Sequence, residues 1–249
     1  IVGMHGGGFL FGGGALDDDL WTNVSACLGA DVASVDYRQS PEAMDHECLL
    51  DVYDSAYYLY EHAQEFGFDK SRISLFGCSA GGNLAAAAAL LSLKRKNLVF
   101  ANQILIYPFL DGYTDPDEKG EGSFSGIMPH VMNKLHFSPE LANDPFLSPL
   151  YASVDMLMEL PNSIVVYCEH DNLRNEAVKY CEMLKNAKVR TSEMLAAEMP
   201  HGFIEMGFKK DLSELEINML GENGKSLFES GLLKERSLET LEFVKAHMV

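Results

Sequence analysis

The chain has 249 residues, of which 47% are hydrophobic and 22% are charged, a composition typical of a globular protein with a sizeable core. It carries 19 Lys and Arg against 37 Asp and Glu, which gives a formal net charge of −18. So acidic a surface repels phosphate backbones and anionic lipid, which argues against nucleic-acid binding and against docking on a membrane surface.

Short β-rich runs alternate with helical patterns along the chain, which predicts an α/β fold with a mostly parallel central sheet and helices on both faces. We expect strands at residues 1–5, 32–36, 72–76, 103–107, 163–168 and 191–195. We expect helices at residues 17–28, 45–66, 80–93, 174–187 and 227–249. Neither a repeat nor a linker divides the chain, so residues 1–249 are predicted to form a single domain. Segments 111–151 and 208–232 break the alternation and are interpreted as insertions at a rim of the sheet.

The apolar runs and the cysteines argue against a membrane-spanning protein, a disulfide framework and a zinc site. The longest apolar run, Leu84–Leu91, is far shorter than the roughly 18 residues that cross a bilayer. The cysteines are widely spaced and contain no C-x-x-C pair, which argues against a disulfide framework and against a zinc site. They are Cys27, Cys48, Cys78, Cys168 and Cys181. We therefore expect reduced thiols and a cytoplasmic protein.

The chain starts without an initiator methionine, at Ile1-Val2-Gly3-Met4. We expect that upstream sequence is missing, and a signal peptide within it stays an open alternative.

The strongest chemical signal is the G-x-S-x-G pattern from Gly77 to Gly81, which lies between a predicted strand and an Ala-rich predicted helix. This context is typical of a nucleophile elbow, in which Ser79 takes a strained turn and the glycines avoid collisions with the neighbouring strand and helix. The serine hydroxyl then lies at a helix N-terminus, where backbone amides favour a developing oxyanion. By itself the pattern is weak, since ordinary Gly-rich turns look the same.

A second signal is the run His5-Gly6-Gly7-Gly8-Phe9 directly after the first predicted strand. Consecutive glycines leave backbone amides bare, and such amides can donate hydrogen bonds to a carbonyl oxygen that becomes negative during acyl transfer. A phosphate-binding loop is the alternative, but the spacing matches neither of the common phosphate-binding patterns.

Five motifs together resemble the hormone-sensitive-lipase-like carboxylesterases of the α/β-hydrolase fold, and they occur in that family's order. They are His5–Gly8, Asp36–Glu42, Gly77–Gly82, Glu169–Glu176 and His201–Phe203. The resemblance implies that Ser79 is the nucleophile, Asp171 the acid and His201 the base. It also implies an oxyanion hole built from the amides of Gly7, Gly8 and Ala80.

The positions of Asp171 and His201 fit these roles, although each has a simpler reading. Asp171 follows a predicted strand and precedes a helix, so it lies at the strand rim where sites of α/β sheets gather. It could instead cap the helix, and so could Asn172. His201 follows the last predicted strand by a short loop through Pro200, whereas a lone loop histidine is usually only solvated. As a general base it predicts activity that rises through a pKa of about 6.5.

The resemblance also implies structural roles and shows departures. His5 is expected to support the glycine loop, Asp36 and Arg38 to form a buried ion pair, and Asp111 to fix a loop. Cys78 stands where the family usually carries Asp, and we expect its thiol to point away from the glycine loop. The family's early strands and the cap over its acyl pocket precede the glycine loop, and they are not visible in this sequence.

We therefore predict a serine carboxylesterase for short-chain acyl esters that needs neither a cofactor nor a metal. Phe9 and Leu10 are the candidates for a small substrate pocket. The expected partner is a small-molecule ester, and we consider a homodimer as the assembly. An amidase, arylformamidase or peptidase on the same triad is the first alternative, because the pocket decides the substrate. A catalytically silent ligand-binding module is the second, against which the three intact triad residues argue.

Overall fold

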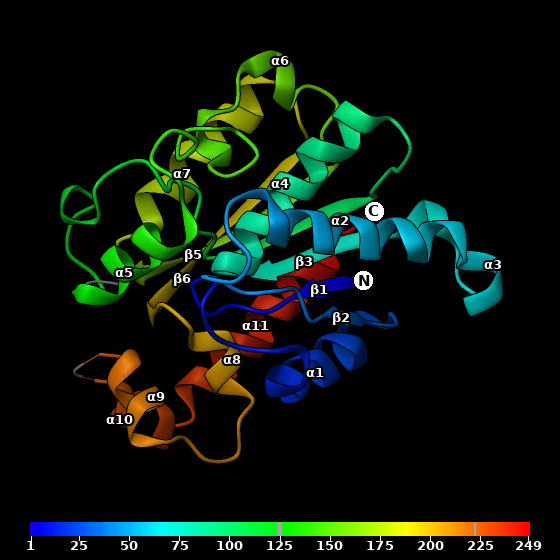
Figure 1. Cartoon of the computed structure of the whole chain (residues 1–249). Helices are drawn as coiled ribbons and strands as arrows, with labels where there is room; N and C mark the ends of the chain where they lie inside the picture. The colour runs from blue at the N-terminus through cyan, green and yellow to red at the C-terminus, as the bar shows by residue number, and fades with distance from the viewer. Residues whose placement is uncertain (124–125, 222) are drawn as a thin grey trace.

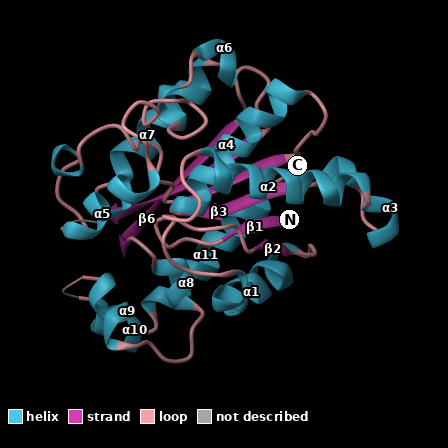
Figure 2. Ribbon diagram, in the orientation of Figure 1, coloured by secondary structure: helices cyan, strands magenta, loops and turns pink. Residues whose placement is uncertain are grey.

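The computed structural model describes residues 1–123, 126–221 and 223–249, and its centre is a parallel sheet of six strands (Figures 1 and 2). The strand order is β2-β1-β3-β4-β5-β6, and every neighbouring pair is parallel. The strands are β1 Val2–Met4, β2 Ala33–Val35, β3 Ser74–Cys78, β4 Asn102–Ile106, β5 Asn162–His170 and β6 Thr191–Pro200. The predicted α/β class is confirmed.

Helices cover both faces of this sheet (Figure 1). The α-helices are α1 Asp18–Leu28, α2 His46–Glu61, α3 Ala63–Phe66, α4 Ala80–Arg95, α5 Ile127–His136, α6 Val154–Leu157, α7 Arg174–Asn186, α8 Phe203–Gly207, α9 Glu214–Met219, α10 Gly224–Glu229 and α11 Leu232–His247. Short 3-10 helices lie at Gly14–Asp17, Lys70–Arg72, Pro116–Glu118 and Pro149–Tyr151.

Successive side chains of each strand point to opposite faces of the sheet, so the strands contribute to two hydrophobic clusters, one on each face of the sheet. On β3, Leu75 belongs to the cluster under α2, α4 and α7, whereas its neighbour Phe76 belongs to the cluster under α1, α8 and α11. On β5, Val165 and Val166 divide in the same way. Burial on both faces explains the continuous apolar runs at Ile104–Ile106 of β4 and Ile164–Val166 of β5. Because all strands run in one direction, their carboxyl ends share one rim, where the active-site motifs follow.

The predicted elements differ from the structure mainly at their ends. Strand β6 continues to Pro200, so no loop separates it from His201. The predicted helix 45–66 is two helices, and the predicted helix 227–249 is interrupted at Gly231, whose φ of 79° is left-handed. The rim segment 111–151 contains α5, and the segment 208–232 contains α9 and α10. Residues 124, 125 and 222 of these segments lie outside the described residues.

The structure also bears on the cysteines and on membrane-spanning helices. The five cysteines are all free thiols, as the sequence predicts. Among the helices of residues 1–123, 126–221 and 223–249, none combines the length and the apolar character that crossing a bilayer requires.

Candidate active site

Ser79 occupies the turn between β3 and α4, with φ 56° and ψ −117°. This left-handed conformation is unfavourable for a residue with a side chain, so surrounding contacts must hold it. The Ser79 amide donates to the Ile106 carbonyl at 2.9 Å, and the Phe109 amide donates to the Ser79 carbonyl at 3.1 Å. Strand β4 and the loop after it therefore clamp the strained turn and leave the hydroxyl at the strand rim.

The two glycines of the motif are needed because backbone passes close to both of them. A Cβ on Gly77 would collide with the Gly81 carbonyl, and a Cβ on Gly81 would collide with the Met4 carbonyl. The sequence-based explanation of the G-x-S-x-G spacing as relief of collisions is confirmed, since the clashing atoms belong to the following helix and the neighbouring strand.

His201 lies between Ser79 and Asp171 and contacts both. Its Nε2 is 2.8 Å from the Ser79 hydroxyl, and its Nδ1 is 2.7 Å from Asp171 Oδ2. The imidazole comes directly after β6, and the His201 amide donates to the Ser123 hydroxyl at 2.8 Å. The side chain of His201 is 10% exposed and that of Asp171 is 1% exposed, so this chain of hydrogen bonds is shielded from water.

Asp171 uses its two carboxylate oxygens for different purposes. Oδ2 contacts His201, while Oδ1 accepts a hydrogen bond from the Leu173 amide at 3.0 Å. The N-cap of α7 is Leu173 and has no side-chain capping bond, so Asp171 closes the turn before α7 without capping the helix, and its other oxygen is directed to His201. Asn172 makes no capping bond, because its buried side-chain oxygen has no partner among the described residues.

The glycine loop lies beside Ser79. A Cβ on Gly6 would be 3.5 Å from Ser79 Cβ, so this part of the loop passes next to the serine. Gly7 and Gly8 have φ values of 109° and 61°, and within the described part of the chain their amides donate no hydrogen bond. Ala80 is the first residue of α4, a position whose amide has no acceptor inside the helix. These three amides therefore remain the candidates for an oxyanion hole.

The electrostatics of the site favour a protonated imidazole. Burial by itself lowers the pKa of His201, but the negative charge of Asp171 and its hydrogen bond outweigh this, so the pKa of His201 is raised above its usual value. Glu205 and Glu176 contribute to the pKa of His201 in the same direction. The sequence-based expectation of an ordinary histidine pKa therefore needs correction.

We expect the acid limb of the kcat/KM profile to lie above pH 6.5, because the base acts only when neutral and its pKa is raised. The measurement is kcat/KM for a soluble ester between about pH 5 and pH 9, a profile that reports ionisations of the free enzyme. A limb centred below pH 6.5 would show that the surrounding carboxylates do not act on His201.

Several expectations about neighbouring residues are confirmed. His5 is fully buried, stacks on Tyr37 at 4.2 Å, and its Nδ1 is 2.7 Å from the Gly6 carbonyl, so it supports the glycine loop. Asp111 accepts hydrogen bonds from the amides of Tyr113 and Thr114 and fixes its loop. The direction of the Cys78 thiol away from the glycine loop stays a prediction, whereas burial raises the pKa of this thiol well above its usual value and so leaves it a poor nucleophile.

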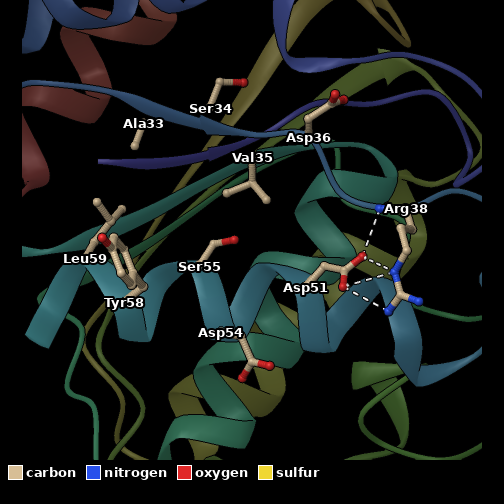
Figure 3. Close-up of a pocket in the computed structure, with 10 residues that line it drawn as sticks. All are labelled: Ala33, Ser34, Val35, Asp36, Arg38, Asp51, Asp54, Ser55, Tyr58 and Leu59. Carbon is tan, nitrogen blue, oxygen red and sulfur yellow. Dashed lines mark hydrogen bonds and ion pairs between the residues drawn. The ribbon is translucent and has the colours of Figure 1, made fainter.

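The predicted buried ion pair between Asp36 and Arg38 is wrong. Arg38 instead binds Asp51 of α2 at 2.9 Å, and the Arg38 side chain is 59% exposed. This pair lies in a groove of 690 Å³ between the edge strand β2 and α2, and no residue of the triad lines it (Figure 3). The Arg38 guanidinium therefore binds a carboxylate on α2, the next α-helix in the chain, and not the carboxylate of Asp36 two residues before it.

The structure gives the two pocket candidates a different environment from the one predicted. Phe9 has no exposed surface and stacks on His136 of α5 at 3.9 Å, so it belongs to the core. Leu10 is partly buried and packs against the same cluster. Met132 of α5 lies against the loop, and its sulfur would be 3.0 Å from a Cβ on Gly8.

One group of residues on the rim has side chains that could act together as metal ligands. Ligand atoms of Asp115, Asp117 and His130 lie within 4.8 Å of one another. His130 already contacts Asp117 at 3.0 Å, and the Asp117 side chain is 84% exposed. His130 and Asp117 already bind each other on the surface, and neither residue belongs to the triad.

The comparisons with known proteins agree with this geometry. The model of a family described as alpha/beta hydrolase fold matches residues 1–205. The chain is 32% identical over 213 residues to an arylesterase of Saccharolobus solfataricus, covering 82% of this chain and 68% of the relative. It is 29% identical over 215 residues to an ethyl acetate hydrolase of Pseudomonas putida, covering 83% of this chain and 66% of the relative. The chain thus spans about two thirds of the length of these relatives.

A solved structure extends the similarity over the whole chain. It is carboxyl esterase 2 of the mycorrhizal fungus Tuber melanosporum, with a TM-score of 0.82 and 27% identity, covering 100% of this chain and 78% of that one. The chain therefore belongs to the alpha/beta hydrolase fold family, and its resemblance to the hormone-sensitive-lipase-like carboxylesterases of that fold is confirmed.

Proposed function

We propose that this protein is a serine carboxylesterase that hydrolyses short-chain acyl esters through an acyl-enzyme on Ser79. The observation that carries the proposal is the position of His201, which is within hydrogen-bond distance of both Ser79 and Asp171. This arrangement lets one imidazole take the serine proton while a carboxylate stabilises the imidazolium that forms. The ester-hydrolase names of the relatives support the same chemistry.

In the first half-reaction, His201 removes the hydroxyl proton as Ser79 attacks the ester carbonyl carbon. The carbonyl oxygen becomes negative and accepts hydrogen bonds from the amides of Gly7, Gly8 and Ala80. When the tetrahedral intermediate collapses, His201 gives its proton to the leaving alkoxide, and the alcohol departs. The acyl group then remains bonded to the serine oxygen.

In the second half-reaction, water takes the place of the alcohol. His201 removes a proton from the water, which attacks the acyl carbon and breaks its bond to the Ser79 oxygen. The serine regains its proton from His201, and the carboxylic acid leaves. Every atom of this cycle comes from the ester, water and the triad, so the proposal includes neither metal nor cofactor.

We expect kcat/KM to be highest for esters with about two to six acyl carbons. Each methylene that enters a pocket stabilises binding by about 0.8 kcal/mol, and carbons beyond the pocket's end gain nothing. The net charge of −18, with acidic rim segments at 111–121 and 211–222, should also repel anionic interfaces. The measurement is kcat/KM across p-nitrophenyl esters from acetate to palmitate.

Two results would contradict this substrate class. One is a maximum at about twelve or more acyl carbons, which needs a long apolar channel. The other is activation by emulsified triglyceride, which requires adsorption to an interface. The soluble butyrate ester, assayed with and without added emulsion, is the internal control because the emulsion should leave its rate unchanged.

The alternative activities use the same residues on other substrates. An amidase, arylformamidase or peptidase needs the same triad, and a panel of matched amides and esters separates them by their kcat/KM ratio. A silent binding module would bind esters without turnover, and the hydrogen-bonded triad argues against it. We further propose one domain over residues 1–249. A homodimer and a cytoplasmic location stay predictions, which light scattering and cell fractionation test.

A further inference from the structure

Glu205 is a carboxylate next to the triad that the proposed mechanism does not use. It lies on α8, four residues after His201. The Tyr107 hydroxyl donates a hydrogen bond to Glu205 Oε2, and Glu205 Oε1 lies 3.1 Å from the place that a Cβ on Gly6 would take. One carboxyl group thus accepts a hydrogen bond from the residue after β4 and lies beside the glycine loop.

Tyr107 connects this carboxylate to the base. Its ring is fully buried, and its centroid is 4.8 Å from that of His201 and 5.6 Å from that of Phe203. Tyr107 has a φ of 35°, a left-handed conformation that surrounding contacts must hold. Its hydroxyl is anchored at Glu205 and its amide donates to the Val166 carbonyl at 2.6 Å. The tyrosine therefore forms a fixed surface beside the imidazole.

The charge of Glu205 also acts on the site. Loss of hydration raises the pKa of Glu205, and its negative charge helps to raise the pKa of His201. The groups that face Glu205 are Asp17, Cys78, Tyr107, Cys168, His201 and Lys209, and those that face His201 are Glu205, Asp171 and Glu176. A negative charge beside the imidazole stabilises its protonated form, which arises when Ser79 attacks.

We propose that Glu205 is a positioning residue of the esterase site: through Tyr107 it holds the His201 ring, and its charge stabilises the imidazolium. The inference rests on the proposed function and deepens it. It assigns to His201 a second carboxylate besides Asp171, and this carboxylate acts through Tyr107.

The test compares Glu205→Gln, Glu205→Leu and the control Glu214→Gln. Glutamine keeps the shape and an acceptor for Tyr107 but loses the charge, so the acid limb of kcat/KM should move to lower pH by about half a unit or more. We expect kcat to fall about threefold to tenfold with little change in KM. Leucine removes the acceptor too, and kcat should fall about tenfold further. Glu214 is exposed on α9, and its variant should match the wild type.

The pH profile decides the outcome, since a merely structural role would not move it. A Glu205→Gln profile that superimposes on the wild type overturns the inference, even if the variant is less stable. Thermal unfolding and phosphonate labelling of Ser79 show whether each variant is folded. Tyr107→Phe is the second variant, and unchanged kcat in it would also overturn the positioning role. If Ser79→Ala keeps its turnover, the proposed function fails instead, so the two failures are distinguishable.

Discussion

Replacing Ser79 with alanine is expected to lower ester turnover by about 10⁴-fold or more while leaving the fold intact. The expected loss is large because the variant lacks the Ser79 hydroxyl that lies 2.8 Å from His201 Nε2 and that attacks the ester in the proposed mechanism. The fold should persist because the turn is held by backbone hydrogen bonds to Ile106 and Phe109, which alanine keeps. The measurement is kcat with a p-nitrophenyl ester, together with the thermal unfolding midpoint.

Labelling by a serine-directed phosphonate provides the control. The reagent should modify Ser79 in the wild type and in Cys78→Ala, because the Cys78 thiol is buried and its pKa is raised. Peptide mass spectrometry locates the adduct. Modification at Cys78, or full activity of Ser79→Ala, would refute the assignment of the nucleophile.

The second large effect is expected for Asp171→Asn, which should lower kcat by about 10⁴-fold. The Leu173 amide donates to one oxygen of the side chain, so an asparagine would keep its oxygen there and turn its NH₂ toward His201 Nδ1. An NH₂ group donates, so Nδ1 would have to accept its hydrogen bond, and the neutral imidazole would then carry its proton on Nε2. It could then no longer accept the proton of Ser79.

Two companion variants make this prediction specific. His201→Ala removes the base itself and should lose at least as much turnover as Asp171→Asn. Asp155→Asn makes the same chemical change on an exposed position of α6 and should leave kcat unchanged. Wild-type rates in either Asp171→Asn or His201→Ala would show that another residue fills that role.

The nucleophile elbow could be predicted from the sequence because its determinants are local. Gly77, Ser79 and Gly81 lie within five consecutive residues between a β-rich run and an Ala-rich helix, and the collisions that require the glycines involve atoms of that same turn and of β1. The alternation of strands and helices likewise determines the α/β class, since each element is encoded by its own periodicity.

The partners of Ser79 were predictable as residue types but not as contacts. The motif order indicated Asp171 and His201, whereas their distances depend on β5 and β6 pairing in register. The extra length of β6 comes from pairing of Pro200 with His170 beyond an irregularity after Cys168. Such a long-range feature has no local sequence signal, and for that reason a loop was predicted there.

Only the tertiary structure decided which side chains lie in contact. Arg38 forms an ion pair with Asp51 and not with Asp36. Phe9 stacks on His136, which lies on a helix more than a hundred residues later in the chain. Glu205 accepts a hydrogen bond from Tyr107, 98 residues earlier in the chain, because the ends of distant strands lie side by side at the rim of a parallel sheet. The sequence by itself determined the class of fold, and it indicated Ser79 as the candidate nucleophile and the order of the triad motifs. The environment of the base depended on packing, since a side chain's neighbours are set by the whole sheet and not by its own segment.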